Sequence, residues 1–236
     1  MNVADTLDWL RTSPLVGVVL TLVAYRIGRE VQQRTHGHAL AQPVLVAIVL
    51  IGGAMWLIGI DYEGYLAGGA VIAFLLGPAT VALAVPLHRQ SRHLRALALP
   101  MLVAIPVGAV VSITSAVLLV RWLGGTEELA LTLAPKAATT PVALALSDTV
   151  GGLPPLTAVL AILIGILGAV AGPAVLDLLR IRDRSARGIA LGAVSHGIGT
   201  SRALQEDRTE GAFAGLSMGL TALTISLLLP VVLLLI

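Results

Sequence analysis

Two short stretches in the second half of this chain carry side chains whose types and spacing could form a binding site. The first, PKAATTPVALALSDTVGG, spans Pro135 to Gly152 and contains Lys136, which is the only lysine in the sequence. The second, ALGAVSHGIGTSRAL, spans Ala190 to Leu204 and contains a histidine. Both lie in apolar surroundings, where a charged side chain is costly unless it faces a partner, water or a ligand. We therefore expect the two stretches to meet and form a binding site for a small anion.

The first stretch combines a cation with a helix break. Its candidate binding residues are Lys136, Thr139, Thr140 and Pro141. A helix that starts near Pro141 would offer unpaired N–H groups and the positive end of its dipole to an anion. Two plainer alternatives remain open. The threonines would then only cap a helix, and Lys136 would extend to the outer interface near the glutamates at 127–128.

The second stretch offers hydroxyls and glycines around its histidine. Its candidate binding residues are Ser195, His196, Gly197, Gly199, Thr200 and Ser201. Imidazole titrates near neutral pH, so His196 is a candidate for proton coupling, and Asp148 of the first stretch is a second candidate for ion coupling. The alternative is that His196 only bonds a backbone carbonyl. One histidine without cysteines or clustered carboxylates makes a poor metal site, so neither a metal nor a cofactor is expected.

The composition identifies the surroundings of these stretches as a lipid bilayer. Of the 236 residues, 57% are apolar and 12% are charged, whereas a soluble domain is about one-quarter charged. The absence of cysteine excludes disulfides and thiolate metal sites, and 3% aromatic residues provide no platform for nucleic-acid bases. Asp5 and Asp8 precede the first apolar run, which does not fit a basic-headed signal peptide.

Six apolar segments are long enough, or nearly long enough, to cross about 30 Å of hydrocarbon. They are Pro14–Tyr25, Pro43–Ile60, Leu66–Leu87, Leu97–Leu123, Leu153–Leu179 and Gly211–Leu235. Arginines follow the first and third of these segments, which predicts that those two loops are cytoplasmic. The residues at 26–34 are expected to form the first basic loop.

Two further segments, residues 126–152 and 188–206, are too interrupted to be simple spans. If each enters and leaves the membrane on one side, the four arginines between residues 180 and 187 stay cytoplasmic with the other basic loops. The two segments then enter from opposite sides, and each is followed by one full span. Broken helices paired in an inverted repeat are typical of secondary transporters.

These patterns predict an all-α polytopic membrane protein with about six full spans plus two re-entrant segments arranged as an inverted repeat. Residues 1–125 are expected to form a four-span scaffold region, and residues 126–236 a transport region. Gly165, Gly168 and Gly172 in the fifth span would allow close helix packing. The pattern G-x-S-x-G around Ser217 lies inside an apolar helix rather than at a strand-to-helix turn, so we do not expect an enzyme.

Four strings in the second half resemble the LrgB/CidB family of membrane proteins. They are KAATTPVALALSDTVGGLPPLTA (Lys136–Ala158), ILGAVAGP (Ile166–Pro173), ARGIALGAVSHGIGTSRA (Ala186–Ala203) and GAFAGLSMGL (Gly211–Leu220). The first half matches this family in hydropathy and length only. The resemblance implies a multi-pass protein of the bacterial cell (inner) membrane.

The resemblance implies two competing functions. Some members of the family are named as holin- or antiholin-like modulators of murein hydrolase activity and autolysis. Others are similar to carriers of small monocarboxylates, namely a plastid glycolate/glycerate translocator and bacterial pyruvate carriers. From the helix breaks we predict a transporter of small monocarboxylates that is coupled to an ion gradient, with the holin- or antiholin-like role as the alternative.

The resemblance also implies partners. The family typically works with a small LrgA/CidA-type membrane protein, and no such module precedes Pro14, so this chain is expected to be the LrgB-like half alone. The expected partners are a small carboxylate, the lipid bilayer, an LrgA/CidA-type protein and further copies of the chain. Nucleic acid is not expected.

Overall fold

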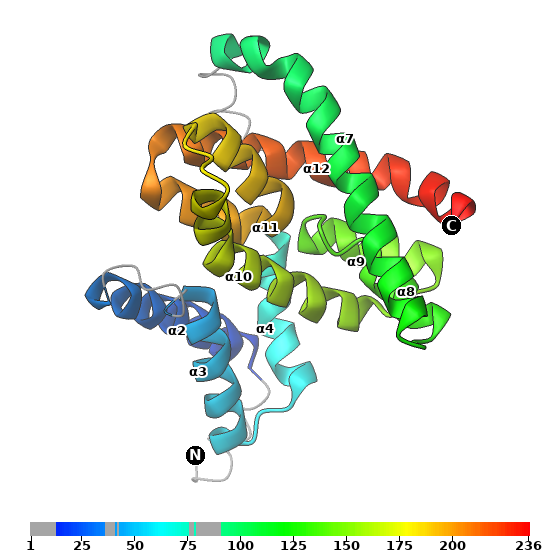
Figure 1. The fold of residues 1–236 in the computed structure, drawn as a ribbon. Helices are drawn as coiled ribbons and strands as arrows, with labels where there is room; N and C mark the ends of the chain where they lie inside the picture. The colour runs from blue at the N-terminus through cyan, green and yellow to red at the C-terminus, as the bar shows by residue number, and fades with distance from the viewer. Residues whose placement is uncertain (1–12, 36–40, 42, 76–77, 79–90) are drawn as a thin grey trace, which may run out of the picture. The chain divides into compact units, whose positions relative to one another are not determined.

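The computed structural model describes residues 13–35, 41, 43–75, 78 and 91–236, and it contains no strand within these ranges. The predicted all-helical class is confirmed. The helices are α2 (Pro14–Arg34), α3 (Pro43–Ile58), α4 (Tyr62–Phe74), α7 (Ser91–Trp122), α8 (Glu127–Leu133), α9 (Thr140–Val150), α10 (Pro154–Leu178), α11 (Arg184–Glu206) and α12 (Arg208–Leu235) (Figure 1). They fall into two compact groups, within residues 1–84 and 85–236.

Three described helices are long and apolar enough to cross a membrane. They are Leu97–Trp122 within α7, Pro154–Leu178 and Arg208–Leu235. These helices match the predicted fourth, fifth and sixth spans, and the apolar helix α3 matches the second but has only 16 residues. The predicted third span extends beyond Leu75 into residues outside the described part. The chain is a helical membrane protein, and the count of six spans stays a prediction.

In the first group, α2 packs against both α3 and α4. A methyl group added to Gly17 of α2 would lie 3.1 Å from the Cα of Gly68 in α4. Such a small-residue contact lets two helix backbones approach closely without the bulk of side chains. The Thr21 hydroxyl also lies 2.8 Å from the Tyr65 hydroxyl, which joins the same two helices by a hydrogen bond.

The prediction that residues 26–34 form a loop is wrong, because α2 continues through Arg34. Glu30 forms ion pairs with Arg26 and Arg34, each four residues away on the same helix face. Pairs at this spacing stabilise an exposed helix by about 0.2–0.5 kcal/mol each. The hydrogen bond and charge of Arg34 also lower the pKa of Glu30.

In the second group, α12 packs against α11 and α7, while α10 packs against α11 and α9. The largest cluster of buried apolar residues combines α7, the segment from α8 to α9, and the second half of α12. Its members include Ile113, Val117, Ala130, Ala134, Ala138, Ala143, Ile225 and Leu229. The interrupted segment at 126–152 is therefore enclosed by two of the long apolar helices.

Candidate functional site

The first helix break lies between α8 and α9. Helix α8 ends at Leu133, and α9 begins at Thr140 with Thr139 as its N-cap residue and Pro141 in its first turn. The predicted helix start near Pro141 is confirmed. The side chain of Thr139 makes no capping hydrogen bond, so the alternative that this hydroxyl serves as a cap is wrong.

After this break the chain folds back until it contacts Thr132, near the end of α8. Gly151 adopts a left-handed conformation (φ 84°) and ends α9, and the N–H of Leu153 then donates to the Thr132 hydroxyl at 2.9 Å. The Thr157 hydroxyl contacts the Thr132 carbonyl at 2.9 Å and the Ser147 hydroxyl at 2.6 Å. These buried hydroxyls close residues 127–153 into what we call the first hairpin.

Lys136 lies in the turn of the first hairpin and contacts α7. Its ammonium donates to the carbonyl of Ser112 at 3.0 Å and to the hydroxyl of Ser112 at 2.6 Å. Among the described residues, no carboxylate forms an ion pair with Lys136. Glu127, one of the two glutamates near which the plainer alternative placed Lys136, pairs with Arg121 at 2.6 Å. The half-buried ammonium is therefore held by two neutral oxygens and not by a carboxylate of the described residues.

The second break is a reversal of the backbone at His196, within α11. His196 has φ 41° and ψ −129°, close to the first corner of a type II′ turn, a conformation that favours glycine. Before the break, Gly188 lies against Glu210, and Gly192 lies against Ala214. Both numbers in these pairs rise together, so the first arm of α11 (residues 184–195) runs in the same direction as α12.

After the break, the second arm of α11 runs in the opposite direction to α12. A methyl group on Gly215 would lie 3.7 Å from Thr200, and one on Gly211 would lie 2.6 Å from Leu204. One number in these pairs rises while the other falls, so the second arm (residues 197–206) returns antiparallel to α12. Residues 184–206 thus form a second hairpin, whose two ends both lie near the start of α12.

The two breaks contact one another. The Nε2 atom of His196 lies 3.3 Å from the carbonyl oxygen of Lys136. A carbonyl only accepts, so in this bond Nε2 carries the proton. His196 therefore bonds a backbone carbonyl, as the plainer alternative held, but the carbonyl belongs to the other break. The predicted meeting of the two stretches is confirmed at this contact.

Helix α10 makes room for the second break with its predicted glycines. A methyl group on Gly165 would lie 2.8 Å from the His196 ring, and one on Gly168 would collide with the Ser195 hydroxyl. On Gly172 it would lie 2.6 Å from Leu191. The prediction that these glycines permit close packing is confirmed, because any larger residue there would push the second hairpin away.

Some of the other predicted residues of the second stretch are buried, and others are exposed. Ser195 is buried, and its hydroxyl has no hydrogen-bond partner. The Thr200 hydroxyl donates to the His196 carbonyl at 2.8 Å, and the buried Gly199 lies against Ser195. Gly197 and Ser201 are exposed. Ser201 therefore points away from the contact between the breaks.

Asp148 is not brought to this contact. It is exposed near the C-terminal end of α9, eight residues beyond Thr140, which corresponds to about 12 Å along a helix. The structure gives Asp148 no ion pair with a described residue. Its predicted part in ion coupling stays a prediction without geometric support.

A cavity of about 590 Å³ borders Lys136. Its wall follows α7 from Pro100 to Ser112 and is completed by residues of α10, α11 and α12. Apolar side chains form most of this wall. Thr221 of α12 also lines it and is only 3% exposed, and its hydroxyl has no hydrogen-bond partner among the residues that the structure describes.

Sequence reasoning missed Ser112, Thr221 and the hydroxyl cluster around Thr157. A single hydroxyl in an apolar span is a weak signal, because serine and threonine can bond a carbonyl of their own helix. Only the contacts between helices distinguish these residues from ordinary ones. Ser217 is a contrasting case, because it is buried and its hydroxyl donates to the Ile189 carbonyl at 2.7 Å.

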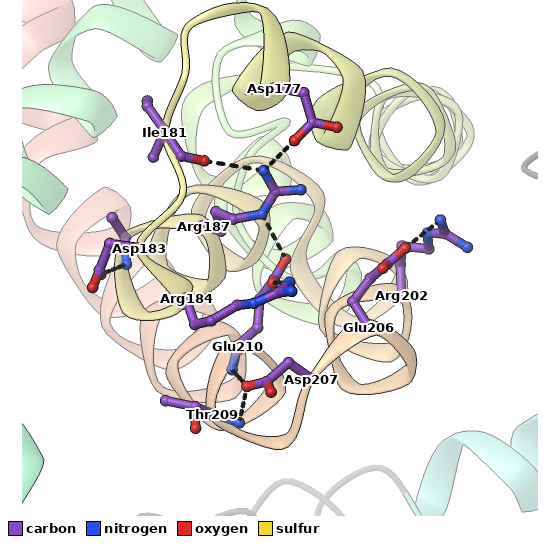
Figure 2. Close-up of polar contacts among 11 residues, drawn as sticks. Asp177, Ile181, Asp183, Arg184, Arg187, Arg202, Glu206, Asp207, Thr209 and Glu210 are labelled. Carbon is purple, nitrogen blue, oxygen red and sulfur yellow. Dashed lines mark hydrogen bonds and ion pairs between the residues drawn. The ribbon is translucent and has the colours of Figure 1, made fainter.

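A buried ion network fixes the ends of the second hairpin (Figure 2). Glu210 at the start of α12 is fully buried and accepts from Arg184 at 2.8 Å. Arg187, whose side chain is 8% exposed, lies 3.5 Å from Glu210 and 2.6 Å from Asp177 at the end of α10. Arg187 also donates to the Ile181 carbonyl at 3.1 Å. The network joins the end of α10, the first arm of α11 and the start of α12.

Helical hairpins that meet inside a group of long apolar helices, with a lysine at their contact that has no carboxylate partner in the described part of the chain, define a membrane protein with a candidate anion site. The chain belongs to the LrgB-like family, whose model matches residues 21–235. The resemblance seen in the sequence is thereby confirmed.

Similar proteins cover nearly the whole chain. YwbG of Bacillus subtilis (strain 168), described as uncharacterized, is 36% identical over 209 residues, which is 89% of this chain and 92% of YwbG. The antiholin-like protein LrgB of the same strain is 31% identical over 219 residues, 93% of this chain and 95% of that protein. The holin-like protein CidB of Staphylococcus epidermidis is 29% identical over 218 residues, 92% of this chain and 95% of CidB. No solved structure matches the chain.

Proposed function

We propose that this protein has a holin- or antiholin-like role in the bacterial cell membrane, and that its biochemical activity is to bind and carry a small monocarboxylate. The two parts of the proposal have different support. The first part is the better supported, and it follows from the names of the relatives. Proteins named antiholin-like and holin-like align with nine-tenths of this chain. On this view the protein modulates murein hydrolase activity and autolysis.

The second part depends on one observation, the lysine at the contact between the two helix breaks. Lys136 has no carboxylate partner among the described residues and borders a cavity. A carboxylate ligand would supply the missing counter-charge through a charge-assisted hydrogen bond. A wide unselective pore would need polar-lined helices, whereas the long helices here are apolar.

The proposal extends to the topology. The two hairpins would enter from opposite sides of the membrane, as in transporters built from inverted repeats. Residues 126–236 would form the transport region and residues 1–125 the scaffold, with about six spans in total. His196 would couple transport to protons, and an LrgA/CidA-type protein and further copies of this chain would be partners.

The decisive experiment measures uptake and lysis with the same variants. The purified protein would be reconstituted with and without an LrgA/CidA-type partner, and uptake of labelled pyruvate, glycolate, glycerate and lactate would be followed. Lys136→Met should reduce uptake about tenfold to hundredfold, which corresponds to loss of a charged hydrogen bond worth about 1.5–3 kcal/mol. Lys136→Arg should retain part of the activity, and the exposed Glu206→Gln should retain all of it.

The outcomes separate the two parts of the proposal. Uptake that depends on Lys136, together with altered autolysis of cells that carry Lys136→Met, would link both parts to one site. Altered autolysis without measurable uptake would leave the holin- or antiholin-like role alone and refute the carrier activity. Uptake that is unchanged by Lys136→Met would refute the site.

A further inference from the structure

The cavity beside Lys136 is much larger than a three-carbon acid requires. Its volume is about 590 Å³, whereas about 10–15 Å³ of such space is enough to hold one water molecule. Pockets for drug-sized organic ligands range from about 300 to 1,000 Å³ and are mostly apolar with a few placed polar groups. The cavity therefore has the size and the composition of a site for a ligand with a substantial apolar body.

The distribution of polar and apolar residues along the cavity wall predicts how such a ligand would be oriented. Along α7 the cavity extends from Pro100 to Ser112, a distance of about 18 Å on a helix. Lys136 and Ser112 lie at one end of this length. The walls toward the other end are formed by residues such as Ile105, Ile189 and Ala190. A ligand that lies along this cavity would have a polar group at the lysine end and carbon along the rest.

Two polar groups at the cavity have bonding capacity left. An ammonium has three N–H donors, and Lys136 uses two of them on Ser112. The hydroxyl of Thr221 is buried and has no partner within the described ranges, although an unsatisfied buried polar group costs about 1–3 kcal/mol. Each of these groups can donate a hydrogen bond to a carboxylate. Its charge would also compensate the ammonium, which a neutral ligand cannot do.

We infer that this site takes amphipathic monocarboxylates with an extended hydrocarbon body, in preference to the hydrophilic two- to four-carbon acids. The inference rests on the proposed carboxylate-binding function and specifies its substrate class. Each methylene that enters the apolar part of the cavity should tighten binding about fourfold. Such an acid can reach the site from water or from the bilayer, where it is a free fatty acid.

The test uses a homologous series of labelled acids and the full-length protein in nanodiscs. Acetate, butyrate, hexanoate and octanoate would be measured by equilibrium dialysis, with octanol as the uncharged control for partition into lipid. Saturable binding should tighten along the series, and Lys136→Met should weaken octanoate binding about tenfold or more. Mass spectrometry of fatty acids that copurify from cells would distinguish the bilayer source from the aqueous one.

A matched pair of glycine variants tests whether the cavity itself holds the hydrocarbon. Gly108 lines the cavity, and a Cβ atom added there meets no atom within 4 Å, so Gly108→Leu adds a side chain at the cavity wall without a clash at its first atom. Gly219 is equally open but does not line the cavity, so Gly219→Leu is the control. Gly108→Leu should remove the dependence on chain length, and Gly219→Leu should preserve it.

Each result discriminates between the inference and the function on which it rests. If short acids bind through Lys136 and longer acids bind no better, the inference is wrong and the proposed function remains. If no acid of any length binds, both are wrong. If octanoate binds to the Lys136→Met and Gly108→Leu variants as tightly as it binds to the unsubstituted protein, the ligand lies elsewhere and the inference is refuted.

Discussion

Replacing Glu210 by glutamine should loosen the whole second hairpin. The carboxylate is fully buried and lies between Arg184 and Arg187. Removing one member of a buried ion pair costs about 3–5 kcal/mol, because the remaining charge is left unpaired. Two features of the network reduce the cost here. Arg184 is half exposed and returns to water, while Arg187 keeps Asp177 at 2.6 Å. We therefore expect a loss near the lower limit, about 3 kcal/mol in the free energy of unfolding.

The assay is reversible unfolding in mixed micelles, with Glu206→Gln as the control. Glu206 pairs with Arg202 on the same helix and is partly exposed, so its loss should cost no more than about 0.5 kcal/mol. Replacing Glu210 by leucine and Arg187 by methionine together should cost less than Glu210→Gln alone, because no buried charge remains unpaired. If Glu210→Gln costs no more than Glu206→Gln, the network does not hold the hairpin, and the reasoning is refuted.

Three further predictions concern the two hairpins and the start of α12. Thr157→Val should destabilise the first hairpin by about 1–3 kcal/mol, because the Thr132 carbonyl and the Ser147 hydroxyl lose a buried partner. A cost near zero in the same unfolding assay would contradict this. The free energy of unfolding of the His196→Gly variant should exceed that of the His196→Ala variant by about 1–2 kcal/mol, because glycine tolerates φ 41° without the strain that a Cβ atom causes. Uptake should be lost in both variants, and equal stability would show that the reversal is not strained. N–H groups of Glu210 and Thr209 donate to Asp207 and lower the pKa of its carboxylate, so this residue stabilises the fold above its unfolded pKa of about 3.9. That stability should be lost as the pH falls through the lower folded value, and Asp207→Asn should remove this part of the pH dependence of unfolding.

Much of the site was predictable because it depends on local chemistry. A proline with two threonines interrupts a helix whatever surrounds it, and α9 does begin at Thr140. The glycines of α10 likewise signal close approach of a neighbour, and the neighbour is the second hairpin. The helical continuation to Arg34 was not predicted. Charge suggested a loop there, but ion pairs along one helix face favour a helix.

The remaining parts of the site depend on partners far apart in the sequence. Ser112 accepts a hydrogen bond from Lys136, which is 24 residues away in the sequence, and Glu210 accepts one from Arg184, which is 26 residues away. Neither pairing leaves a periodic signal, because each requires the packing of different helices. The same holds for the unpartnered hydroxyl of Thr221, which has significance only beside the cavity.

The sequence by itself determined that this is a helical membrane protein with two interrupted segments, since hydrocarbon thickness, apolar run length and proline chemistry act locally. The arginine positions also predicted that each segment folds back on itself, but only the tertiary structure decided that His196 contacts the carbonyl of Lys136. The reason is physical. A break frees backbone groups that hydrocarbon cannot satisfy, but which partner satisfies them depends on how the helices pack.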